Sequence, residues 1–175
     1  MKLTLSERFR SLFQNPDKMA KEIGISEGKV VADIGAGKGF LTIPTSVIVG
    51  KGGLVYSVEP NPKRSRRITE RAASEGLKNV CVLTTGAEKL GEIPSDSVDV
   101  AFSAFSFHHF KDKAVSLTEI KRILKSGGTF SVWDRVPGTI VRHGTRPVEL
   151  EQFSGSFTKF ELLNAQRTVK ARFTK

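Results

Sequence analysis

The sequence lacks the features that mark secreted or membrane-spanning chains. It has one cysteine, Cys81, so it can form neither an internal disulfide nor a zinc cluster built from cysteines. No run approaches the roughly 20 apolar residues that cross a bilayer. The amino terminus, MKLTLSERFRSLF, carries charges where a signal peptide has an apolar core. We therefore expect a cytoplasmic protein without a membrane span.

Length and composition predict one folded domain. The chain has 175 residues, of which 38% are hydrophobic, and 16 glycines raise the apolar share to an ordinary globular value. These proportions exclude wholesale disorder and leave no room for a separate catalytic half. We divide residues 1–175 into a helical amino-terminal segment (1–28), a central core (29–135), and a loop with a terminal β-hairpin (136–175).

Positive charge is in excess and unevenly placed. The net charge is +10, and residues 60–80 carry six basic and two acidic side chains, while residues 135–175 carry eight and three. Such clusters attract RNA, acidic proteins or anionic small molecules. We favour a solvated surface that aids solubility, because runs of charge usually serve that purpose. Contact with RNA or an acidic protein is the alternative.

Short apolar runs alternate with helical patterns through the central core. The expected strands are 29–34, 54–59, 80–83, 98–103 and 129–133. The expected helices are 40–49, 63–75 and 114–124, the last closed by Gly127-Gly128, after an amino-terminal helix in two pieces whose second piece runs from Asn15 to Gly24. This alternation implies βαβ units and a mostly parallel sheet. After residue 135 we expect a loop (136–147), a short helix (148–153) and an antiparallel hairpin turning near 164–167.

The strongest functional signal is the loop Asp33-Ile34-Gly35-Ala36-Gly37-Lys38-Gly39, between the first strand and a helix. Glycines permit a sharp turn and a close approach of ligand to backbone, and the helix amino terminus favours an anionic group. The spacing differs from the dinucleotide fingerprint G-x-G-x-x-G, and a phosphate-binding loop would need Ser or Thr after Lys38. A purely structural turn is the alternative.

Glu59 ends the second strand, 26 positions after Asp33. In nucleotide-binding sheets an acidic residue there accepts hydrogen bonds from the ribose hydroxyls, and a carboxylate fits a vicinal diol with both oxygens. The alternative is an exposed glutamate at the end of a strand. Together with the glycine loop, Glu59 favours a nucleoside-containing cofactor.

Five segments now carry a family resemblance: VVADIGAGKGFLT, VYSVEPNP, TTGAEKL, DSVDVAFSAFSFHHF and EIKRILKSGGTFSVWD. With them the chain resembles class I S-adenosylmethionine (SAM)-dependent methyltransferases, type 11, the subgroup with the ubiquinone/menaquinone C-methyltransferases. The resemblance covers about residues 8–135. It implies a Rossmann-like, doubly wound α/β fold: a seven-stranded, mostly parallel sheet with an antiparallel last strand, in a three-layer α/β/α sandwich. It also implies that 29–135 is the SAM-binding core and that S-adenosylhomocysteine is the product.

The resemblance implies ten cofactor-binding residues: Asp33, Gly35, Ala36, Gly37, Glu59, Pro60, Gly86, Ala87, Glu88 and Ser103. Glu59 would bind the ribose and Ala87 the adenine ring through its N–H. One position departs from the family, whose members often have Asp where this chain has Gly86. Either Glu88 or a backbone carbonyl replaces that carboxylate, or adenine is held more weakly.

We expect the methyl acceptor to bind beyond the ends of the fourth and fifth strands, where the segment SAFSFHHF and Asp134 lie. Imidazole titrates near pH 6.5, so His108 and His109 are candidate bases. Adjacent residues point in different directions, and we favour His108, which is closer to the strand, as the one that faces the pocket. A histidine that packs or caps a helix is the alternative. No third ligand accompanies the pair, and Asp99 lies at the wrong end of its strand, so we predict no metal site.

Two hypotheses remain. The first is a methyltransferase with a small-molecule acceptor. The second is a methyltransferase, or a non-catalytic SAM-binding module, that acts on RNA or protein through the basic surface. The Pro-Pro-aromatic motif of adenine amino-group methylation is absent after the fourth strand, and Cys81 lies inside a strand, unsuited to cytosine C5 chemistry. The pocket would be open, or closed by the amino-terminal helix or by the second subunit of a homodimer.

Overall fold

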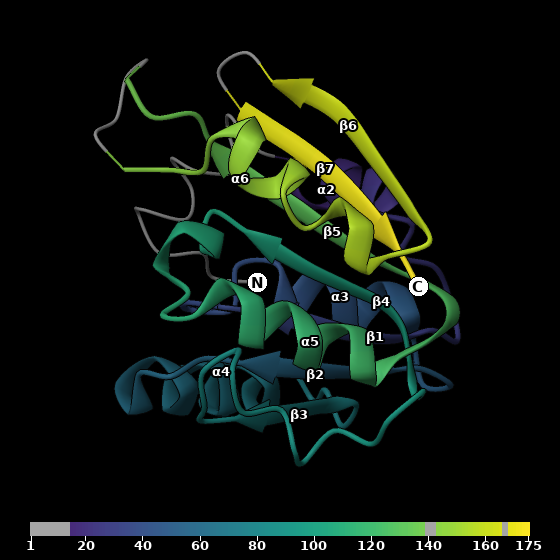
Figure 1. The fold of residues 1–175 in the computed structure, drawn as a ribbon. Coiled ribbons are helices and arrows are strands. Elements are labelled where there is room, and N and C mark those ends of the chain that lie inside the picture. The colour runs from purple at the N-terminus through teal and green to yellow at the C-terminus, as the bar shows by residue number, and fades with distance from the viewer. Residues whose placement is uncertain (1–14, 139–142, 166–167) are drawn as a thin grey trace.

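A computed structural model describes residues 15–138, 143–165 and 168–175. In these residues one seven-stranded sheet has the order β3-β2-β1-β4-β5-β7-β6 (Figure 1). The strands are β1 (Val30–Ile34), β2 (Leu54–Val58), β3 (Val80–Leu83), β4 (Val98–Ala104), β5 (Leu124–Arg135), β6 (Lys159–Ala165) and β7 (Thr168–Thr174). β1 to β5 pair in parallel, and β7 runs antiparallel to both β5 and β6. The predicted Rossmann-like sheet with its reversed last strand is confirmed.

Helices flank this sheet. They are α2 (Pro16–Ile23), α3 (Thr42–Val49), α4 (Pro62–Ser74), α5 (Lys113–Ile123) and α6 (Pro147–Glu151), with the 3₁₀ helices η1 (Phe107–His109) and η2 (Ser154–Ser156). In the described part of the chain, no helix is long and apolar enough to cross a membrane.

The two faces of the sheet bury two separate cores. Side chains alternate along each strand, so Val31 packs with α2 and α3 on one face while Ala32 packs with α5 on the other. Figure 1 shows α5 and α6 on the near face of the sheet and α3 behind it. The three-layer arrangement leaves the carboxyl ends of β1, β2 and β4 uncovered at one edge.

Asparagine caps begin two of the helices. Asn15 Oδ1 accepts from the N–H groups of Asp17 and Lys18, and Gly24 ends α2 with φ of +93°. Asn61 caps α4 in the same way, with Pro62 in the first turn. The predicted helix from Asn15 to Gly24 is confirmed, because the cap satisfies amino-terminal N–H groups and the glycine adopts the left-handed conformation that ends a helix.

The prediction that Gly127-Gly128 closes a helix is wrong. α5 ends at Ile123, and β5 already begins at Leu124. The pairing of β4 with β5 shifts register here, from Val98 with Leu124 to Val100 with Thr129. The two glycines lie in this irregular stretch, where Gly127 N donates to Lys175 O and Gly128 O accepts from Lys175 N. Glycine serves a bulged strand as well as a helix end, and only the long-range pairing distinguishes the two.

The carboxyl-terminal prediction is confirmed in its described parts. β6 and β7 form the expected antiparallel hairpin, preceded by the short helix α6. Positions 166–167 of the predicted turn, 139–142 of the predicted loop and the first piece of the amino-terminal helix, within 1–14, lie outside the described residues.

Candidate active site

The glycine loop after β1 is shaped by the neighbouring strands. The N–H groups of Gly35 and Ala36 donate to the Val58 carbonyl at 2.8 and 3.0 Å. Gly35 has φ of +80°, and a Cβ there would lie 2.5 Å from Ser106 Oγ. A side chain at residue 35 is therefore disfavoured both by the backbone conformation and by the close approach of the chain after β4. The loop draws the ends of β1, β2 and β4 together.

Glu59 is a buried carboxylate at the end of β2, with only 3% of its surface exposed. Its Oε2 accepts from Gly37 N at 2.8 Å and its Oε1 from Asn61 N at 3.0 Å. Arg64 Nη1 lies 3.8 Å from Oε1. Each carboxylate oxygen has two acceptor positions, so these N–H groups fix the carboxylate and leave capacity for two hydroxyl groups of a ligand.

Asp33 lies beside Glu59, near the end of β1. It is 3% exposed, and its Oδ2 accepts from Thr42 Oγ1 at 2.7 Å. Thr42 belongs to the first turn of α3, and its hydroxyl also lies 3.1 Å from Ser57 Oγ. The side chain of Asp33 is thus held by the helix that follows the glycine loop.

Glu88 bends back over Gly86. A Cβ on Gly86 would collide with Glu88 Oε2, so the glutamate fills the space that a side chain at residue 86 would need. Its Oε1 accepts from Lys111 N at 2.8 Å and Asp112 N at 3.2 Å. Burial alone would raise the pKa of Glu88, but hydrogen bonds from the backbone N–H groups of Glu88, Asp112 and Lys111 outweigh it and hold the pKa below its usual value. Glu88 is therefore an anion at neutral pH.

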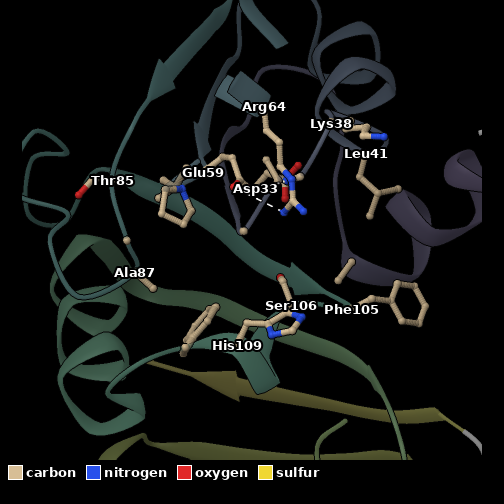
Figure 2. Close-up of a pocket in the computed structure, with 18 of the residues that line it drawn as sticks. Asp33, Lys38, Leu41, Glu59, Arg64, Thr85, Ala87, Phe105, Ser106 and His109 are labelled. Atoms are coloured by element: carbon tan, nitrogen blue, oxygen red, sulfur yellow. Dashed lines mark hydrogen bonds and ion pairs between the residues drawn. The ribbon is translucent and has the colours of Figure 1, made fainter. Parts of the chain in front are cut away.

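These groups surround a cavity of about 850 Å³, within the usual range for small-molecule sites. Figure 2 shows Asp33, Glu59 and Arg64 on one side, with Ser106 and His109 opposite. Thr85 and Ala87 lie toward one end, and Leu41 and Phe105 toward the other. Nine of the ten predicted cofactor-binding residues line this cavity: Asp33, Gly35, Ala36, Gly37, Glu59, Pro60, Gly86, Ala87 and Glu88.

Ser103 is the exception. It is fully buried in β4 and does not line the cavity, and its Oγ lies 2.7 Å from Ser106 Oγ. Ser106, three residues on, lines the cavity and also donates to the Ile34 carbonyl at 3.0 Å. The side chain that reaches the cavity is therefore that of Ser106, in the turn after β4. Phe105, in the same turn, has a φ of +59°, in the left-handed region. No sequence signal marks a positive φ at a phenylalanine.

The two histidines occupy different places. His109 lines the cavity, whereas His108 does not and instead directs its Nδ1 at Asp134, 2.8 Å from Oδ2. The prediction that His108 faces the pocket is therefore wrong, because the buried carboxylate at the end of β5 holds that ring. Partial burial lowers the pKa of His109. The charges of His108, Arg64 and His143 act in the same direction, and Asp134 opposes them.

Arg64 is a wall residue that the sequence did not reveal. We expected the basic cluster of residues 60–80 to form a solvated surface, and one of its members, Arg64, also lines the cavity beside Glu59. Met19 of α2 also lines it, so the amino-terminal helix contributes to the wall. Met19 could have been suspected from its place on the apolar face of α2.

The described residues offer no cluster of metal-binding side chains. In residues 15–138, 143–165 and 168–175, no three His, Cys, Asp or Glu side chains gather in a way that could hold a metal ion. Asp99 lies at the opposite edge of the sheet, where Val30 N, Lys29 and Lys125 surround it. The absence of a metal from the reaction stays a prediction.

The family model described as a methyltransferase domain, type 11, matches residues 32–132, more than half of the chain. The chain belongs to the type 11 methyltransferase family. The matched segment includes the glycine loop, Glu59 and both histidines.

Individual relatives agree with this assignment. The chain is 36% identical over 110 residues to a ubiquinone/menaquinone biosynthesis C-methyltransferase from Hydrogenovibrio crunogenus, covering 62% of this chain and 43% of that protein. It is 27% identical over 124 residues to an uncharacterized methyltransferase from Geobacillus thermodenitrificans, covering 70% and 54%. The chain thus spans about half the length of the curated relatives it matches.

A solved structure matches this chain over nearly its whole length. A SAM-dependent methyltransferase from Aquifex aeolicus superposes with a TM-score of 0.78 at 26% identity, covering 94% of this chain and 92% of that one. The likeness therefore extends beyond the 32–132 segment to include the terminal hairpin.

Proposed function

We propose that this chain is a SAM-dependent methyltransferase that acts on a small, largely apolar acceptor, with His109 as the base. The observation that carries the proposal is that the Glu59 carboxylate, fixed by Gly37 and Asn61, lies in the same cavity as His109 and several apolar side chains. Those apolar lining residues include Met19, Phe40, Leu41, Ala104, Phe105 and Phe110.

Several lining residues support SAM binding along this wall. Glu59 would hold the ribose hydroxyls, with Asp33 and the Gly35–Gly37 turn around the methionine portion. Pro60, Ala87 and Gly86 would flank the adenine, with Glu88 in the space of the missing side chain at residue 86. Because Glu88 is anionic, it offers an acceptor for an amino group at that end of the cavity. Ser103 would act through Ser106, its hydrogen-bond partner.

When bound, SAM supplies a methyl group whose bond to the sulfonium sulfur breaks as its bond to the acceptor forms. The chain's own residues then have two tasks, which are to hold the acceptor in line and to receive its proton. The apolar side chains around Phe105 would place an acceptor ring, and a ring nitrogen of His109 would take the proton from the methylated oxygen, nitrogen or activated carbon. The lowered pKa of His109 keeps the imidazole neutral at pH 7, as a base must be.

Acceptor class is tested by a labelled-methyl transfer screen. The protein and labelled SAM are incubated with cell-extract fractions divided into small molecules, RNA and protein. We expect label in a small-molecule fraction, and none when Glu59→Ala replaces the wild type at limiting SAM. Label confined to RNA or protein would overturn the small-molecule proposal.

A polyanionic acceptor is the second candidate, and the position of Arg64 favours it. Arg64 belongs to the basic helix α4 and yet lines the cavity, so a positively charged surface leads to the site. Lys38, Lys89 and Lys111 add cations to the same wall. An RNA acceptor would show binding that weakens steeply with salt, because phosphate contacts release counterions.

A further inference from the structure

Asp134 is a buried carboxylate that methyl transfer as proposed above does not use. Its side chain is wholly excluded from solvent at the end of β5. Four donors converge on it: His108 N at 3.1 Å, His108 Nδ1 at 2.8 Å, Arg135 N at 2.9 Å and Thr145 Oγ1 at 2.8 Å. A buried charge with this many aligned donors is held in one position, because losing any one of them would leave it poorly solvated.

His108 connects Asp134 to the cavity. Its Nδ1 lies between the two carboxylate oxygens of Asp134, 3.0 Å from Oδ1 and 2.8 Å from Oδ2. Its ring contacts the ring of His109, with centroids 3.9 Å apart and planes at 45°. Only His109 lines the cavity. An ordered row therefore runs from Asp134 through His108 to His109.

Thr145 ties a distant segment to this row. It is fully buried, its hydroxyl donates to Asp134 Oδ2, and its N–H donates to the Arg135 carbonyl at 2.8 Å. The chain that leaves β5 thus returns to the end of β5 before α6 begins. A carboxylate beside Nδ1 favours a proton on that nitrogen, and the Thr145 hydroxyl helps to hold this carboxylate in place.

We propose that Asp134 and Thr145 are positioning residues that fix the His108 tautomer and, through the contact between the two rings, the orientation of His109 in the cavity wall. The expected effect on the rate of methyl transfer rests on the proposed function, in which His109 is the base. The expected effect on the tautomer and orientation of the two rings is independent of that function. The charged groups that act on the pKa of His109 are His108, Asp134, Arg64 and His143, and each can contribute to a pH dependence at this ring.

The first test uses the free protein and needs no acceptor. Nitrogen chemical shifts of labelled histidine report the tautomer at about pH 8, where imidazole is mostly neutral. We expect the wild-type His108 proton on Nδ1, and Asp134→Asn should move it toward Nε2, because the asparagine amide group can donate to Nδ1. A wild-type His108 protonated on Nε2, or a tautomer and His109 signals unchanged in Asp134→Asn, would overturn the proposal.

The second test covers the case in which Asp134→Asn does not fold. Thr145→Val removes the hydroxyl at nearly constant volume, and Thr145→Ser should restore its effect. We expect Thr145→Val to shift the His108 and His109 ring signals and slow single-turnover transfer about three- to tenfold at unchanged SAM affinity. Thr158→Val, which removes a hydroxyl bonded to Thr174 O, is the matched control and should keep the full rate.

The outcomes separate the two proposals. Ring signals that move in Thr145→Val while His109→Gln keeps the wild-type rate would refute the base and retain the positioning role. Ring signals and rate that both stay at wild-type values in Thr145→Val would refute the positioning role, whatever His109→Gln does.

Discussion

At the scale of single residues, the backbone fixes the Glu59 carboxylate in one orientation. Its two oxygens accept from N–H groups of the glycine loop and of the cap of α4. If Glu59 binds ribose as proposed, the carboxylate needs no rearrangement to meet the hydroxyls.

We expect Glu59→Ala to weaken SAM binding by about 1.5–3 kcal/mol, the usual worth of hydrogen bonds to a charged group. Isothermal titration calorimetry on folded protein measures this. Glu70→Gln changes an exposed glutamate of α4 and should bind like the wild type. Equal affinity in Glu59→Ala and the wild type would show that ribose is bound elsewhere.

A second prediction at this scale concerns the pH dependence of His109. Its lowered pKa means that the ring gains a proton only below its usual value of about 6.5, so the single-turnover rate should fall on the acid side of that pH. His109→Gln should be about 10²–10⁴-fold slower and should lack this acid limb, while binding SAM normally. Rate measurements from pH 5 to 8 check both; an unchanged profile in His109→Gln means that no proton passes to this ring.

At the scale of elements, Asp99 joins three strands at the edge of the sheet opposite the cavity. It lies on β4, its Oδ2 accepts from Val30 N at the start of β1, and its Oδ1 lies 2.9 Å from Lys125 Nζ on β5. Burial alone would raise the pKa of Asp99, but the Val30 hydrogen bond and the charges of Lys125 and Lys29 lower it on balance.

This arrangement predicts a pH-dependent stability. A carboxyl with a folded pKa below its unfolded value of about 3.9 stabilises the fold fully above that value and loses its contribution as pH falls through the folded pKa. Asp99→Asn should therefore lower stability at pH 7 and reduce the loss between pH 7 and pH 3. Urea unfolding across this range measures both. A slope of stability with pH equal to that of the wild type would contradict the assignment.

Element boundaries also show the limit of local signals. The caps at Asn15 and Asn61 act within a few residues, so the starts of α2 and α4 follow from the sequence. Gly127 and Gly128 do not, because their role depends on Lys175, almost fifty residues away, which exchanges two hydrogen bonds with them.

At the scale of the whole molecule, the excess positive charge is the feature that bears on substrate choice. The exposed Lys63 and Arg66 of α4, with the half-buried Arg67, form a basic surface beside the cavity. Arg64, on the same helix, lines the wall itself. The basic surface thus lies next to the cavity, but Lys63, Arg66 and Arg67 are not among the residues that line it.

Reversing Lys63, Arg66 and Arg67 to glutamate, with Arg64 kept, should leave turnover of a small acceptor within a few-fold of wild type. Exposed surface charges contribute little to a site that they do not touch. Steady-state kinetics and SAM calorimetry on the triple variant test this. A collapse of turnover with intact SAM binding would instead indicate an RNA or another polymeric anion as the substrate.

By itself the sequence determined the alternation of strands and helices in the core, the antiparallel terminal hairpin and the glycine loop with Glu59 at the end of the second strand. Those features rest on short-range patterns, namely apolar runs, caps and turn residues. The remaining predicted cofactor residues came from the family resemblance. Only the tertiary structure decided which of His108 and His109 reaches the cavity, that Arg64 lines it and that Ser103 does not. Each of these depends on a partner from a distant element, such as Asp134 for His108, and no local pattern encodes where such a partner lies.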